Sequence, residues 1–151
     1  PGSFTGVRIG VALVKGLCVA LPHIKVVAVN SLDLMAHEFA KKNLPAQNFC
    51  AIQNALGGRF FVREYASSGA PLGQAALVRE LPVETKVGLR AEALSEADVF
   101  VECPPTELLE YSQKLIKENA FVDAKTLAPV YLRLSQAEEN LQKKEENMEF
   151  F

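Results

Sequence analysis

Apolar positions are unevenly spaced along this chain, and their spacing divides it into segments with different predicted structures. Residues 5–21 are apolar almost throughout, and their only charges, Arg8 and Lys15, share one helical face. A glycine-rich turn before this stretch and Pro22 after it mark the ends of a helix. We therefore predict a helix that needs cover over most of its circumference.

Small residues recur along this helix at four-residue spacing. They are Gly6 and Gly10, followed by Ala12, Gly16 and Ala20. A glycine destabilises a helix by roughly 1 kcal/mol relative to alanine, so repeated glycines indicate that another backbone packs closely against it. We interpret it as a core or interface helix.

A strand and a second helix are predicted next. Residues 25–29 form a β-branched run without polar alternation, which is typical of a central strand covered on both faces. Ser31 is placed to cap a helix over residues 32–42, and the apolar residues of this helix form one stripe. The stripe consists of Leu32, Met35, Ala36, Phe39 and Ala40. Helix, strand and helix in this order predict an α/β layer.

A change of composition at residues 44–48 predicts a boundary between two lobes. The second lobe begins with a hairpin whose loop contains two glycines, and more strands follow. The predicted strands are residues 49–53, 59–66, 75–81 and 99–101. Residues 83–97 give no clear pattern.

A third helix is predicted after Pro104 and Pro105, with Thr106 as its cap and an end near residue 119. Its expected inner face consists of Leu108, Leu109, Leu115 and Ile116. The polar residues 135–149 favour an exposed helical tail.

Composition limits the functional classes. Sixteen basic and eighteen acidic side chains give a net charge of −2, which argues against broad electrostatic binding of nucleic acid by this chain alone. The cysteines, Cys18, Cys50 and Cys103, contain no C-x-x-C pair, which is typical of a reduced cytoplasmic protein. The first helix is too short and too charged for a membrane span.

Residues with catalytic chemistry are sparse. His23 and His37 are isolated, and such histidines are more often surface or capping groups than metal ligands. The opening turn matches neither the P-loop nor the dinucleotide pattern, which favours packing over phosphate binding. We expect no catalytic residue, no metal and no cofactor in this chain.

Two separated motifs resemble one known family. Residues 1–10, Pro-Gly-Ser-Phe-Thr-Gly-Val-Arg-Ile-Gly, closely resemble the glycine-rich turn of the TsaB (YeaZ) family, and residues 129–133, Pro-Val-Tyr-Leu-Arg, are similar to its closing motif. The motif residues are Ser3, Phe4, Thr5, Tyr131, Leu132 and Arg133. For Tyr131 and Arg133 two roles stay open, a partner contact and a pair that locks the lobes together.

The resemblance implies an α/β fold of actin-like, ribonuclease-H-like lobes, the ASKHA superfamily. Residues 1–45 would be the remainder of the N-terminal lobe, residues 46–134 the C-terminal lobe and residues 135–151 a charged helical tail. In that family several dozen residues, including the first strands, precede the glycine-rich turn. We therefore interpret the chain as N-terminally truncated, with an incomplete first lobe.

The resemblance also implies a function. Members of the family are non-catalytic subunits of the complex that makes N6-threonylcarbamoyladenosine on tRNA next to the anticodon. They pair with the catalytic paralogue TsaD, the ATPase TsaE joins them, and tRNA is bound only through the complex. A homodimer in isolation is also compatible with the sequence.

Several positions depart from the chemistry of the wider family. In TsaD the corresponding segment enters a His-x-x-x-His metal site, and the resemblance places Ser31 and Met35 at those positions. Neither is a ligand that a catalytic divalent metal prefers. In the hairpin loop, Asn54 stands where the family usually has Asp, Arg59 where it has Glu, and Phe61 where Tyr is common. We therefore interpret this loop as a structural hairpin.

A partner interface is expected on the first two helices, which correspond to a four-helix contact in the family. Its residues are Gly6, Arg8, Ile9, Gly10, Ala12, Leu13, Gly16, Leu17, Leu32, Met35, Ala36 and Phe39. Two alternatives stay open, an ATP-dependent transferase or glycopeptidase-like enzyme of the actin-like superfamily, and a homodimer with a role outside tRNA modification.

Overall fold

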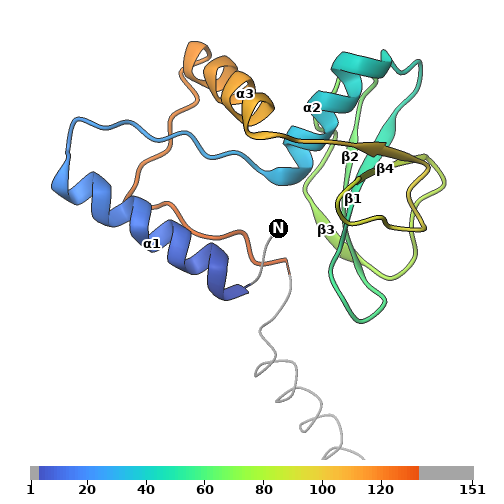
Figure 1. Cartoon of the computed structure of the whole chain (residues 1–151), viewed down its shortest axis with the longest axis horizontal. Coiled ribbons are helices and arrows are strands. Elements are labelled where there is room, and N and C mark those ends of the chain that lie inside the picture. Colours follow the sequence, from blue (N-terminus) through green and yellow to red (C-terminus); the bar gives the residue numbers. More distant parts are fainter. Residues whose placement is uncertain (1–3, 133–151) are drawn as a thin grey trace, which may run out of the picture.

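A five-stranded mixed sheet with a helix packed on one face forms one side of the computed structural model, which describes residues 4–132 (Figure 1). The elements in chain order are α1 (Phe4–Ala20), α2 (Ser31–Asn43), β1 (Phe49–Asn54), β2 (Phe60–Tyr65), β3 (Ala76–Val78), β4 (Thr85–Leu89), β5 (Val99–Val101) and α3 (Pro105–Lys117). The predicted α/β fold is confirmed. The predicted tail, from residue 135 onward, lies outside the described residues.

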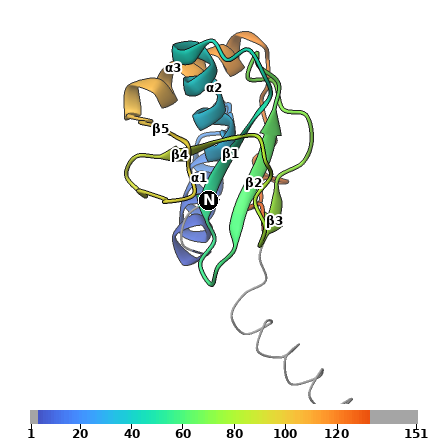
Figure 2. The same cartoon turned by 90° about the vertical axis from the view of Figure 1, so that its right-hand side faces the viewer.

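The sheet has the strand order β3-β2-β1-β4-β5 (Figure 2). β1 and β2 form the predicted antiparallel hairpin, and β1 and β4 run parallel. β4 lies in the stretch for which the sequence predicted no element. Gly88 has no side chain, so it weakens the apolar pattern by which this strand could be predicted. Glycine is needed here because a Cβ at this position would lie 2.8 Å from the Cβ of Ala97.

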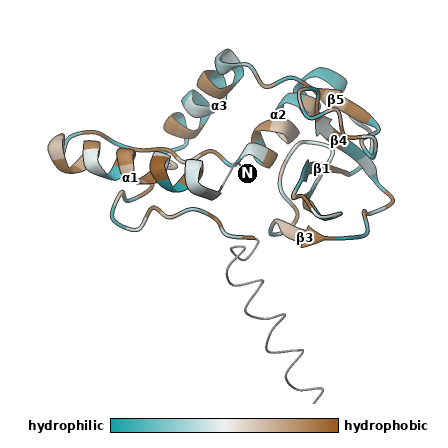
Figure 3. Cartoon of the chain, turned by 60° about the horizontal axis from the view of Figure 1, so that its bottom comes forward, coloured by the Kyte–Doolittle hydropathy of each residue, from teal (hydrophilic) through white to brown (hydrophobic). Residues whose placement is uncertain are grey.

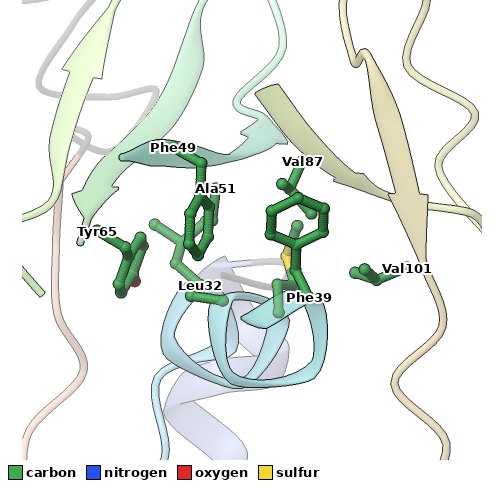
Figure 4. Packing of buried hydrophobic residues seen from close by; sticks show 9 residues of the cluster. Leu32, Phe39, Phe49, Ala51, Tyr65, Val87 and Val101 are labelled. Carbon is green, nitrogen blue, oxygen red and sulfur yellow. The ribbon is translucent and has the colours of Figure 1, made fainter. Parts of the chain in front are cut away.

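The core lies between α2 and the sheet (Figure 4). Leu32, Met35, Ala36 and Phe39 are at most 5% exposed, and the ring of Phe39 packs edge-on against Phe49 with centroids 4.7 Å apart. This corrects their assignment to a partner surface, because the sheet already covers the apolar stripe of α2. A lobe boundary near residue 45 stays a prediction, and α2 packs on strands that were assigned to the second lobe.

The N-terminus of α2 differs in detail from the prediction. Asn30, and not Ser31, is the capping residue, because its side chain accepts a hydrogen bond of 2.9 Å from the backbone N–H of Leu32. The Ser31 hydroxyl instead donates to Oε1 of Gln53 on β1 at 2.8 Å. The first bond caps α2, and the second holds the start of α2 beside the end of β1.

The central strand predicted over residues 25–29 is not formed. Among residues 4–132, this segment pairs with another extended segment only through an isolated bridge between Val26 and Val122. A β-branched run forms a strand when neighbouring extended segments provide backbone hydrogen bonds along its length. Within the described residues, the bridge to Val122 is the one such pairing. The prediction was therefore wrong for the described residues.

Helix α3 begins at Pro105, one residue before the predicted cap, and Pro104 is its N-cap. Its expected inner face is not buried, since Leu108, Leu109 and Ile116 are 43–60% exposed. α3 instead contacts α2 through polar groups, with Lys41 Nζ 3.1 Å from Glu107 and 2.7 Å from Glu110. These ion pairs position α3 without burying its leucines.

Candidate partner-binding face

Helix α1 has two different sides. Its half-buried residues follow each other at helical spacing and are Val7, Val11, Val14, Lys15 and Cys18. The C-terminal part of this side, with Lys15 and Cys18, lies near residues 121–125, where Lys15 Nζ donates a hydrogen bond of 3.2 Å to the backbone carbonyl of Lys125. Every other residue of α1 whose side chain is described is exposed.

The exposed side holds all the α1 residues that were predicted for a partner interface. They are Gly6, Arg8, Ile9, Gly10, Ala12, Leu13, Gly16 and Leu17. Ile9, Leu13 and Leu17, one turn apart, are 63%, 62% and 48% exposed. We name Gly6, Ile9, Gly10, Leu13, Gly16 and Leu17 the outer face of α1. Figure 3 shows the hydrophobic bands that run along this helix, away from the sheet.

Among the described residues, two glycines of the outer face, Gly10 and Gly16, have no neighbouring side chain over them. A Cβ built on Gly10 or Gly16 would have no heavy atom within 4 Å apart from its own local backbone. The predicted tight packing over these two glycines is therefore not made within the described residues. Because a glycine leaves the helix backbone uncovered, a second helix can approach it more closely than it could approach a leucine.

The motif residues are distributed over both ends of the described chain. Phe4 and Thr5 begin α1, while Tyr131 is 51% exposed and Leu132 is half-buried near the other end. Ser3 and Arg133 lie outside the described residues, and so does the side chain of Phe4. The two roles considered for Tyr131 and Arg133 both stay open.

Ser31 and Met35, which the resemblance predicts at the positions of metal ligands, have other roles in this structure. Met35 is fully buried in the core, and Ser31 is engaged with Gln53. Within residues 4–132 no group of three or more His, Cys, Asp and Glu residues is arranged to hold a metal ion. Of the two histidines, His37 lies 4.8 Å from the ring of Tyr111, and burial together with Lys114 and Lys41 lowers its pKa.

The hairpin loop after β1 forms a compact polar turn. The Asn54 side chain accepts a hydrogen bond of 2.7 Å from the Leu56 N–H, and the Asn54 N–H donates to Glu92 at 3.1 Å. Gln53 Nε2 donates to the other oxygen of Glu92 at 3.0 Å. Glu92 was missed because it lies in the stretch without a sequence pattern. Asn54 thus stabilises a turn, as the structural interpretation predicted.

None of the helices in the described part of the chain combines the length and the apolar character that crossing a membrane requires.

Comparisons with known proteins place this fold among its relatives. A family model described as TsaD, tRNA N6-adenosine threonylcarbamoyltransferase, matches residues 1–76. A crystal structure of an uncharacterized protein with similarity to the peptidase YeaZ, from Pseudomonas aeruginosa, matches with a TM-score of 0.65 and 24% identity over 88% of this chain and 70% of that one. YeaZ from Pseudomonas aeruginosa matches with a TM-score of 0.64 and 22% identity over 87% and 71%. At 22–24% identity, these two matches show that this chain has the same fold as the two structures.

Proposed function

We propose a function from one premise, which is that this chain belongs to the TsaD family of tRNA N6-adenosine threonylcarbamoyltransferases. Within that family it acts as a non-catalytic subunit of the complex that makes N6-threonylcarbamoyladenosine on tRNA. It pairs with a catalytic paralogue, TsaD, in the cytoplasm. The ATPase TsaE and tRNA are reached through the assembled complex.

The outer face of α1 is the observation that carries this proposal. Three large aliphatic side chains on one helix face are about half or more exposed, and two glycines beside them meet open space. Contiguous apolar surface of this kind marks protein–protein contacts in soluble proteins. Small residues on a helix face also allow a partner helix to pack closely, which increases van der Waals contact.

Met35 and Asn54, at positions where the resemblance implies metal-binding or carboxylate residues in the family, support a non-catalytic role. The side chain of Met35 is enclosed by the core and cannot reach a ligand without unpacking α2. The amide of Asn54 is occupied in a turn, where the family usually has a carboxylate. A thioether and an amide are poor replacements for the imidazole and carboxylate ligands of catalytic divalent metals.

Bulky substitutions on the exposed side of α1 test the proposal. Gly10→Leu and Ala12→Phe should each weaken association with the catalytic paralogue. Overpacking typically costs roughly 1–3 kcal/mol, and the upper half of that range is about a ten- to a hundredfold loss of affinity. Both positions are exposed, so the isolated chain should keep its fold. Association is measured by analytical ultracentrifugation of the chain alone and mixed with the paralogue, and folding by circular dichroism.

Gly73→Leu is the matched control. A Cβ at Gly73 would also have no heavy atom within 4 Å, and Gly73 lies in the loop before β3 and not in α1. It should leave association unchanged. A homodimer through the same face would appear in the sample without the paralogue and would weaken with the same substitutions. If Gly10→Leu and Ala12→Phe bind the paralogue as tightly as the original chain does, the partner surface lies elsewhere.

A further inference from the structure

The outer face of α1 stays exposed within residues 4–132. Its aliphatic side chains, Ile9, Leu13 and Leu17, are 48–63% exposed. Residues 24–26 and 121–125 lie against the other side of the helix. Segments that pair with residues 24–26 or 121–125 therefore do not cover the outer face.

The outer face has the spacing of a helix–helix contact. Its residues recur at intervals of three and four along α1, and the glycines among them let a second helix approach closely. α1 also carries two positive charges, Arg8 and Lys15, and no negative one. A suitable occupant is therefore an amphipathic helix that has an apolar stripe at the same spacing and is acidic elsewhere.

The tail, residues 135–151, has the sequence of such a helix. Ser135 and Glu138 form the capping-box pattern Ser-x-x-Glu, which predicts a helix from residue 136 onward. An apolar stripe along it recurs at intervals of three and four and consists of Ala137, Leu141, Met148 and Phe151. Lys144 interrupts this stripe, but the aliphatic stem of a lysine can lie along apolar surface. Five glutamates and two lysines give the tail a net charge of −3.

The tail can reach the outer face without a long connection. The last described segment, drawn in orange to red, ends near the start of α1 (Figure 1, Figure 2). Residues 133–135 can span up to roughly 10 Å when extended. A helix over residues 136–151 would be roughly 24 Å long, and α1, with seventeen residues, is roughly 26 Å long. The two helices therefore match in length.

We propose that the tail forms a helix that packs on the outer face of α1 of its own chain and covers this face until a partner displaces it. Because the tail is tethered, its effective concentration at the face is on the order of millimolar. A partner has to displace the tail, which lowers the apparent affinity of that partner. The displacement rests on the proposed function, whereas the docking of the tail does not.

A single tryptophan tests the docking, because the chain contains none of its own. In the full 151-residue chain, Met148→Trp places it on the apolar stripe of the tail. We expect its emission to be blue-shifted and protected from acrylamide, relative to the same variant in urea, at every protein concentration. Leu13→Asp on the outer face, or Leu141→Asp on the stripe, puts a charge into the apolar contact and should raise the quenching constant about twofold or more.

Two variants with the same introduced group are the matched controls. Val83→Asp changes a side chain that is 97% exposed in a loop outside α1. Gln142→Asp changes a position away from the apolar stripe of the predicted tail helix. Both should leave emission and quenching unchanged. Leu13 is exposed, so Leu13→Asp should keep the fold, which circular dichroism checks.

Three outcomes would overturn the proposal. One is quenching of the introduced tryptophan as strong as in urea. Another is protection that Leu13→Asp leaves unchanged, which would put the tail elsewhere on the chain. A third is protection that appears only as the protein concentration rises, which would assign the outer face to a second copy.

Addition of the catalytic paralogue tests the displacement separately. We expect the paralogue to bind and the introduced tryptophan to become exposed. If the paralogue binds while the tryptophan stays protected, the displacement fails and the partner surface lies away from the outer face, although the docking of the tail stands. If the tryptophan is exposed throughout and Gly10→Leu still weakens binding of the paralogue, the docking fails and the proposed function stands.

Discussion

A hydrogen bond between the buried Tyr65 and the half-buried Asp33 joins β2 to α2. Tyr65 is fully buried, its hydroxyl donates to Asp33 Oδ1 at 2.6 Å, and Arg63 Nη1 donates to the same oxygen at 2.7 Å. Burial, followed by the hydrogen bond to Asp33 and its charge, raises the pKa of Tyr65 above its usual range. The neutral hydroxyl is thus the form that the fold requires.

Substitutions of this pair should have unequal effects. Tyr65→Phe removes one hydrogen bond and leaves Asp33 paired with Arg63, so we expect a loss of about 1 kcal/mol in the free energy of unfolding. Asp33→Ala leaves a buried hydroxyl without its acceptor, so its loss should be larger, up to about 3 kcal/mol. Urea unfolding measures both, and equal losses would contradict this account.

The pH dependence of stability follows from the same pair. A tyrosine whose pKa is higher in the folded chain than in the unfolded one keeps its proton longer when folded, so stability falls once pH exceeds the unfolded value of about 10. Tyr65→Phe should reduce this alkaline loss, as measured by urea unfolding between about pH 8 and about pH 11. A control, Tyr131→Phe at an exposed position, should not reduce it.

Strand β4 depends on a close approach at Gly88. A Cβ at this position would lie 2.8 Å from the Cβ of Ala97, so Gly88→Val forces the backbone or Ala97 to move. We expect a loss of roughly 1–3 kcal/mol in the free energy of unfolding. Gly73→Val, at a glycine that meets open space, serves as the control for the loss of a glycine.

Thermal unfolding of the Gly88→Val and Gly73→Val variants gives the comparison directly. Gly88→Ala should already be destabilised, because the clash begins at the Cβ. If Gly88→Val melts at the same temperature as Gly73→Val, β4 tolerates the shift and its packing is looser than the distances indicate.

At the scale of the whole molecule, a non-catalytic role predicts weak ligand binding. Calorimetry of the chain with ATP and Mg²⁺, or with Zn²⁺, should show no micromolar affinity, because Met35 and Asn54 are committed to the core and to a turn. The measurement is repeated in the presence of the catalytic paralogue. A micromolar dissociation constant for the chain alone would favour the alternative of an ATP-dependent enzyme.

The local sequence pattern was sufficient to predict the three helices and the hairpin among the described residues. Polar caps and prolines indicate the approximate ends of each helix, and the hairpin has two apolar runs on either side of Gly57 and Gly58, which adopt positive φ. The apolar character of α1 and its small residues likewise predict an interface helix. These features depend on neighbours along the chain, so the sequence alone contains them.

Tertiary contacts decided the rest. The sequence showed an apolar stripe on α2, but only the position of the sheet decided that Leu32, Met35, Ala36 and Phe39 are core and not partner surface. β4 could not be predicted from the sequence, because Gly88 weakens its local pattern. Its pairing with β1 and β5 in the structure identifies it as a strand. Residues 25–29 have the pattern of a strand, yet strand formation needs a neighbouring ladder, which comes from elsewhere in space. The periodicity of the sequence determines which side of an element is apolar. The tertiary structure determines whether that side packs in the core or stays exposed for a partner.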